Sequence, residues 1–254
     1  MSTTTNKIEF VPCDYPCLEE ALAETLYEDF VVTERPLPWI HRGYGRFTYD
    51  LSDTQYGQAV KDTIINQPKS PVYGDKHFDE RSSVWIQCFV PGAVLPLHRE
   101  YVRGVYTIYL SKDIKPDDES GFMEWHEAQD INRLYDEPIH RISPTFNTGS
   151  YYINPDIDAD QKIYNPWHRV HRNNGTSKRY SLQIFEPVHN NTQANNISDS
   201  NQMINSGHLQ ALGWDKALIN YPEDHKIFDY SAWLPEILQT WQKENKDLIA
   251  SMTL

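Results

Sequence analysis

Long apolar runs and positive charge are both scarce in this chain of 254 residues. No stretch reaches the ~18 consecutive apolar residues of a membrane-spanning helix, so we expect no span of a bilayer. Lysine and arginine number 23 against 36 aspartate and glutamate residues, which gives a formal net charge of −13. A chain this acidic, without a basic stripe, is a poor candidate for binding nucleic acid. The first residues lack a signal-peptide pattern, so we expect a cytoplasmic protein.

Cysteine is also rare, and several catalytic motifs are missing. Three cysteines fit a cytoplasmic protein, and Cys13 and Cys17 lack the second close pair that a zinc site usually needs, so we expect structural or incidental thiols. The sequence contains no HExxH, no Walker A motif, no GxGxxG and no GxSxG nucleophile elbow. These absences weaken a hydrolase or nucleotide-binding interpretation.

Apolar and aromatic residues, at 39% and 13%, suffice for a packed core. Four segments rich in strand-forming residues are bounded by turn residues, at 83–90, 104–111, 149–154 and 179–185. Short strands divided by turns indicate a sandwich or barrel rather than parallel βαβ units. We therefore expect a mainly β fold with flanking helices.

The N-terminal flank carries two helical patterns. Apolar residues recur at helical spacing in 17–29, and a second helix follows Ser52, a plausible N-cap. The segment between them, Arg35–Phe47, holds two prolines and two glycines and is expected to be a loop.

The C-terminal flank begins with an asparagine-rich linker at 190–205. Two helices are expected after it, at 208–219 and 234–250. The apolar face of the second helix packs on the barrel or, as the alternative, forms a homodimer surface.

Two segments could carry chemistry. His98 and Glu100 follow a turn, and residues two apart in an extended chain point the same way, so both side chains could reach one metal ion. His168 lies in a second strand-like segment, followed by a polar turn and then Arg179.

The strand expected at 179–185 alternates between polar and apolar residues, with Arg179 and Ser181 on the polar side. An arginine inside a barrel is costly unless an anion pairs with it. A dicarboxylic cosubstrate would supply that anion, with a bidentate contact to the guanidinium and a hydroxyl contact from Ser181. The alternative is that this polar face meets water, as in many antiparallel sheets.

Together these residues resemble the Fe(II)/2-oxoglutarate-dependent oxygenases of the prolyl-hydroxylase type. HRE at 98–100, the distal His168 and RYS at 179–181 match the family's H-x-D/E…H triad and Arg-x-Ser motif. TIYLSKD at 107–113 is similar to the family's tyrosine-bearing strand, with Tyr109 at the tyrosine. The resemblance implies a double-stranded β-helix, a jelly-roll or cupin-like barrel, over 83–187.

The resemblance also implies the cofactors and the reaction. Fe(II) would be held by two imidazoles and one carboxylate, and 2-oxoglutarate and O2 would take the open positions. The products would be succinate, CO2 and a substrate hydroxylated at a C–H bond. The residues implied as metal ligands are His98, Glu100 and His168, and those implied as 2-oxoglutarate contacts are Arg179, Ser181 and Tyr109.

The resemblance places the whole chain in a single oxygenase domain. It consists of an N-terminal α/β flank at 1–82, the barrel at 83–187, and the linker with the C-terminal helices at 188–254.

Alternatives remain for parts of this motif. His171 rivals His168 as the distal ligand, and His77 with Asp79 forms a second H-x-D, although it precedes the strand that the family places before its pair. The segment from Gly92 to His98 is also similar to the first cupin motif, but cupins want a histidine where Glu100 stands.

The sequence says little about the substrate. Arginines flank both metal-ligand segments and suggest an amino-acid-like or other acidic small molecule: Arg99, Arg103, Arg169 and Arg172. The alternative is that they pair with acids on the surface. The loops 112–142 and 157–166 are long enough to form a lid, with Trp125 packed against the protein or lining that lid. A peptide or protein substrate, and a cupin-like metal-binding protein that does not use 2-oxoglutarate, stay open.

Overall fold

The computed structural model describes residues 9–41, 45–68, 70, 78–93, 95–98, 104–114, 121–126, 140–153, 167–171 and 173–185. The helices within this part are α1 Glu20–Tyr27 and α2 Gln55–Asn66, with the π-helix η1 Glu28–Val32 directly after α1. The strands are β1 Glu9–Cys13, β2 Ile40–His41, β3 Arg46–Asp50, β4 Ser83–Phe89, β5 Leu95–His98, β6 Gly104–Tyr109, β7 Met123–His126, β8 His140–Ile142, β9 Gly149–Ile153, β10 Trp167–Val170 and β11 Arg179–Phe185.

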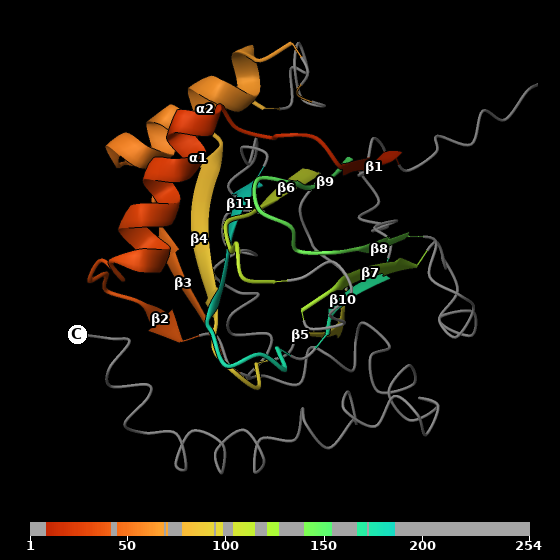
Figure 1. Cartoon of the computed structure of the whole chain (residues 1–254). Coiled ribbons are helices and arrows are strands. Elements are labelled where there is room, and N and C mark those ends of the chain that lie inside the picture. The colour runs from red at the N-terminus through yellow and green to blue at the C-terminus, as the bar shows by residue number, and fades with distance from the viewer. Residues whose placement is uncertain are drawn as a thin grey trace, which may run out of the picture.

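Two antiparallel sheets form the body of the molecule (Figure 1). The major sheet has the strand order β1-β9-β6-β11-β4-β3-β2, and the minor sheet has the order β5-β10-β7-β8. From β4 onward the chain crosses between the sheets at nearly every step, which is the arrangement of a double-stranded β-helix. The predicted mainly β fold with flanking helices and this core is confirmed.

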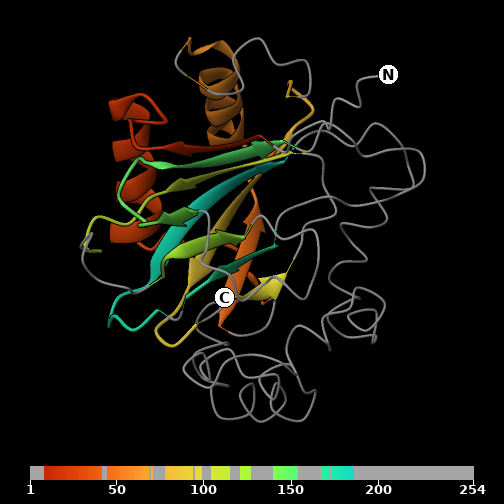
Figure 2. The same ribbon diagram turned by 90° about the vertical axis from the view of Figure 1, so that its right-hand side faces the viewer.

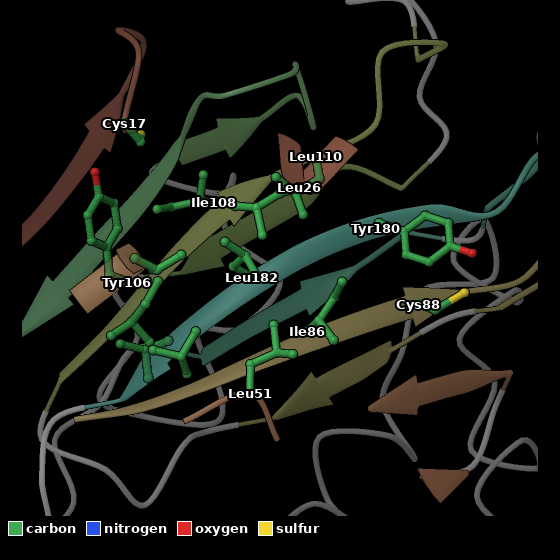
Figure 3. Close-up of a cluster of buried hydrophobic side chains, with 14 of the residues drawn as sticks. Cys17, Leu26, Leu51, Ile86, Cys88, Tyr106, Ile108, Leu110, Tyr180 and Leu182 are labelled. Atoms are coloured by element: carbon green, nitrogen blue, oxygen red, sulfur yellow. The ribbon is translucent and has the colours of Figure 1, made fainter. Parts of the chain in front are cut away.

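One face of the major sheet is apolar and lies against α1 and α2, which stand on the side away from the minor sheet (Figures 1 and 2). Every second residue of β4, β6 and β11 points to this face because side chains alternate along a strand. Figure 3 shows the resulting cluster, in which Ile86, Ile108 and Leu182 are fully buried. Leu26 of α1 packs into the same core. The burial of these apolar side chains between the sheet and the helices holds the helices on the sheet.

The opposite face of the major sheet is polar and is also buried. Gln87, Thr107, Ser150 and Ser181 all lie on it and are almost inaccessible to solvent. The Ser150 hydroxyl donates to Met123 Sδ of the minor sheet at 3.8 Å, so this face points into the barrel. The alternative that the polar face meets water is therefore wrong.

The N-cap of α2 lies two residues after Ser52, the N-cap suggested by the sequence. Thr54 is the N-cap, and its hydroxyl accepts the backbone N–H of Gly57 at 3.1 Å. Ser52 instead accepts the backbone N–H of Val84 at 2.9 Å and so ties the start of the helix to β4.

Two segments expected to be loops contain strands. Arg35–Phe47 holds β2 and the start of β3, and 112–142 holds β7 and β8. The expected linker and C-terminal helices lie outside the described residues, as does the lid segment at 157–166. None of the helices in the described part of the chain has the length and apolar character that crossing a bilayer requires.

Candidate functional site

The two predicted histidine ligands lie on neighbouring strands of the minor sheet. His98 ends β5, His168 is the second residue of β10, and the two are direct partners in the antiparallel register. Such partners have Cα atoms roughly 4.5 to 5.5 Å apart, so the backbone at position 98 lies beside that at position 168. Residues distant in sequence thus come together at one point of the barrel.

Trp125 of β7 stacks on the imidazole of His168. Their ring centroids are 4.3 Å apart and the ring planes differ by 23°. Both side chains are buried, and the register pairs them directly across β7 and β10. Trp125 is therefore packed in the barrel beside His168, as one of the two interpretations of this residue predicted.

The other face of the minor sheet carries a buried charge cluster centred on Glu124. Arg169 of β10 donates from Nε to Oε2 of Glu124 at 2.6 Å, and Arg141 of β8 donates from Nη2 to Oε1 at 2.6 Å. His171 Nε2 lies 2.9 Å from the same Oε1. His171, the rival for the distal ligand, thus pairs with a carboxylate on the face opposite to His168.

Burial alone would raise the pKa of Glu124, but its neighbours reverse that effect. The hydrogen bond with His171, the positive charge of Arg169 and the hydrogen bond from Arg141 hold the pKa of the carboxyl well below its usual range. Glu124 is therefore ionised at neutral pH. The suggestion that Arg169 receives a substrate carboxylate is wrong, because its guanidinium is buried against Glu124.

Arg179 opens β11 and points into the barrel with only 2% of its surface exposed. Its guanidinium carbon lies 5.1 Å from the ring centroids of both Phe89 and Tyr109. These aromatic faces partly replace lost hydration. Among the described residues, however, Nε and Nη1 of Arg179 have no hydrogen-bond acceptor.

Tyr109 and Ser181 lie beside Arg179 on the same interior face. Ser181 pairs directly with Tyr109 across β11 and β6. Burial raises the pKa of Tyr109 to about 12, against the opposing effect of the Arg179 charge. Burial likewise lowers the pKa of Arg179. The phenol therefore stays neutral at physiological pH and can donate its proton to an anion.

Gly121, two residues before β7, packs closely against the Arg179 side chain. Its φ is +69°, and a Cβ built there would lie 2.7 Å from Cδ and 3.1 Å from Nε of Arg179. The sequence interpretation missed this residue, because only the fold brings positions 121 and 179 together. The one available signal was a glycine ending a polar loop.

The donor set fits the groups that the sequence motifs imply. The register brings two histidine positions, 98 and 168, side by side in the backbone of the minor sheet, as two ligands of one ion require. A buried guanidinium with two nitrogens that lack an acceptor in the described part suits a carboxylate.

Several predicted residues lie outside the described residues. They are His77, Arg99, Glu100, Arg103 and Arg172. Without Glu100, the described residues contain no group of three or more His, Cys, Asp or Glu placed to hold a metal.

The three cysteines are free and buried, as expected for structural thiols.

Comparison with known proteins gives similar folds at low identity. No family model and no curated protein matches the chain. It is similar to an oxidoreductase of the 2OG-Fe(II) oxygenase family from Burkholderia pseudomallei, with a TM-score of 0.48 and 13% identity, covering 72% of this chain and 85% of that one. It is also similar to a prolyl hydroxylase from Trichoplax adhaerens in complex with a hypoxia inducible factor oxygen degradation domain peptide fragment, with a TM-score of 0.49 and 11% identity, covering 72% and 84%.

A third similar structure is HygX from Streptomyces hygroscopicus with nickel, 2-oxoglutarate and hygromycin B bound. Its TM-score is 0.42 and its identity 11%, covering 72% of this chain and 83% of that one. Similar solved structures thus include proteins of the family that the sequence motifs resemble. One is described with a peptide and another with hygromycin B, so the similar structures differ in what they bind.

Proposed function

We propose that this protein is a non-haem Fe(II)/2-oxoglutarate-dependent oxygenase. It hydroxylates a C–H bond of a small amino-acid-like or other acidic metabolite and releases succinate and CO2. The observation that carries the proposal is Arg179, a fully buried cation with two guanidinium nitrogens, Nε and Nη1, that lack an acceptor among the described residues. A buried guanidinium is stable there only with an anion to neutralise it.

In this proposal His98, Glu100 and His168 hold Fe(II), which with 2-oxoglutarate and O2 supplies the oxidising equivalents for hydroxylation. The protein contributes by orienting the groups that react and by protecting them from side reactions. Trp125 fixes the ring plane of His168 by stacking on it.

Arg179 neutralises the distal carboxylate of 2-oxoglutarate, and the hydroxyls of Tyr109 and Ser181 donate to it. Because Tyr109 keeps its proton up to a pKa of about 12, this donor is present throughout the physiological range. The buried surroundings exclude water and strengthen each of these contacts.

The acidic-substrate part of the proposal rests on the remaining cations. Arg99, Arg103 and Arg172 flank the ligand segments in sequence. Cations at these positions favour a negatively charged substrate.

The test is the visible absorbance of the anaerobic Fe(II)–2-oxoglutarate complex together with succinate formation in air. The wild-type chain should give both, and His168→Ala should give neither because it lacks a ligand. Arg179→Ala should need far more 2-oxoglutarate, since losing a buried charged contact costs about 2 to 5 kcal/mol, an ~30-fold or greater change in affinity. Arg179→Lys is the matched control, because it keeps the charge but loses the planar fork.

A wild-type chain that binds metal but neither binds nor decarboxylates 2-oxoglutarate would contradict the proposal and support the cupin-like alternative. The substrate class is tested separately, by measuring which compounds stimulate succinate formation. Free amino acids and small acids are expected to do so, whereas stimulation by peptides alone would favour a peptide or protein substrate.

A further inference from the structure

Three strands of the minor sheet meet at one buried carboxylate. Glu124 of β7 is fully buried and takes hydrogen bonds from Arg169 of β10 and Arg141 of β8, which are its direct partners on either side. Arg169 is itself buried, whereas the Arg141 side chain is 46% exposed. The ion pair between Glu124 of β7 and Arg169 of β10 is therefore the part of the cluster that is shielded from solvent.

The cluster lies directly behind the two stacked rings of the candidate site. Arg169 follows His168 in sequence, and Glu124 precedes Trp125. Since side chains alternate across a strand, the ion pair and the stacked rings occupy opposite faces of the same two strands. A shift of β10 along β7 that breaks the ion pair would also move His168 away from Trp125.

The other neighbour of β10 gives a weaker constraint on its register. Between His168 and Val170 the pairing with β5 shifts by a bulge, whereas β10 pairs with β7 at four consecutive positions. The register of His168 is therefore set mainly from the β7 side.

Buried ion pairs add little net stability compared with well-packed apolar residues, but they specify one arrangement of the groups around them. The short strand β10, which has a bulge in its pairing with β5, needs an interaction of this kind to fix its register.

We infer that Glu124 is a positioning residue for the proposed metal site. Through Arg169 it fixes the register of β10 and hence the place of His168. This inference rests on the proposed function, because it assigns Glu124 a role toward a ligand of that site.

The test compares two substitutions, each of which removes one positive charge beside the Glu124 carboxylate. Arg169→Gln removes the buried ion pair between β7 and β10 but leaves His171 beside Glu124, and Arg141→Gln removes the ion pair to β8, which carries no predicted ligand. The probe is Mn(II), whose binding to the full metal-free chain is followed by electron paramagnetic resonance of the free ion. Binding of Mn(II) does not depend on turnover.

Arg169→Gln should weaken Mn(II) binding about tenfold or more, the usual effect of losing a group that orients a metal ligand. Arg141→Gln should change it by less than about twofold, a difference too small to indicate a positioning role. Glu124→Gln should follow Arg169→Gln. Should Arg169→Gln fail to fold, the pair Arg169→Lys and Arg141→Lys replaces it, with the same order expected.

Equal Mn(II) affinities for the Arg169 and Arg141 variants would overturn the inference, and the cluster would then serve stability alone. In that case wild-type binding of Mn(II) and 2-oxoglutarate still supports the proposed function. Absence of Mn(II) binding by the wild-type chain would contradict the proposed function itself and the inference with it.

Discussion

At the scale of single residues, Gly121 leaves the space that the Arg179 side chain occupies. Its backbone has a φ of +69°, in the left-handed region where residues with a Cβ are strained. Any side chain at this position would also meet the Arg179 stem at 2.7 Å. Both the backbone and the available space therefore require glycine beside the buried guanidinium.

We predict that Gly121→Ala displaces Arg179 and weakens 2-oxoglutarate binding by about tenfold or more, because a misplacement of about 1 Å is costly at such a site. The strained φ should also cost about 1 kcal/mol of stability. Isothermal titration with 2-oxoglutarate measures the first effect. Gly175→Ala is the control, since its Cβ would meet no atom closer than 3.3 Å. An unchanged affinity in folded Gly121→Ala would show that Arg179 does not bind the diacid.

The sequence predicted some of these residues and not others, for a physical reason. Histidine, carboxylate and Arg-x-Ser spacings are local patterns, so His98, His168 and Arg179 stand out as candidates. The roles of Gly121 and Glu124 depend on partners far away in the chain. Nothing in the sequence around Glu124 indicates that Arg141 and Arg169 neutralise it, so its burial could not be expected.

At the scale of elements, Asn147 joins the N-terminal segment to the barrel. Its side chain accepts the Leu18 backbone N–H at 2.9 Å and donates to the Leu18 carbonyl at 3.0 Å. Its own backbone N–H donates to the Tyr109 carbonyl at 2.8 Å. Because it has a φ of +56°, Asn147 also makes the turn into β9. One buried residue thus connects the start of α1, the end of β6 and β9.

Asn147→Ala is expected to lower the free energy of unfolding by about 2 to 4 kcal/mol, because it strains the backbone and leaves buried groups of Leu18 without partners. Asn147→Gly is the matched variant, since it keeps the positive φ and loses only the hydrogen bonds. Urea unfolding measures both. The glycine variant should be the more stable of the two, and equal stabilities would mean that φ contributes nothing.

The strands differ in how well the sequence predicts them. Runs of β-branched and aromatic residues between turn residues predicted β4, β6, β9 and β11, which the structure contains. The strands β7 and β8 are short and carry charged or polar residues, so they look like loop in isolation. They become strands because Trp125 and Met123 pack inward while Glu124 finds its cations in the neighbouring strands.

At the scale of the whole molecule, several buried tyrosines and a thiol determine the response to alkali. Burial raises the pKa values of Tyr106 and Tyr180, and raises that of Cys88 to about 12. In the unfolded chain these groups ionise at their ordinary, lower pKa values. Their neutral forms therefore favour the folded state below those values, and this contribution is lost as the pH rises toward the folded values.

We predict a free energy of unfolding that is level near pH 8 and falls above about pH 9 to 10, by up to about 1.4 kcal/mol per pKa unit shifted. Tyr106→Phe should reduce that fall. Its cost at neutral pH should be small, since the Tyr106 hydroxyl has no hydrogen-bond partner within the described part of the chain. Urea midpoints measured across this pH range check both statements. A Tyr106→Phe profile parallel to that of the wild type would contradict the assignment.

The strand order also governs when the chain can fold during synthesis. Both edges of the major sheet, β1 and β2, come from segments that precede the rest of the sheet in sequence, so they leave the ribosome before the strands between β3 and β1 in the sheet order. Yet β1 pairs with β9, and β4 pairs with the central strand β11, which is the last strand in the described part of the chain. Contacts this distant in sequence form slowly. During synthesis β1 therefore keeps an unpaired edge until β9 has been made, and β4 keeps one until β11 is complete at residue 185, and such exposed edges favour aggregation.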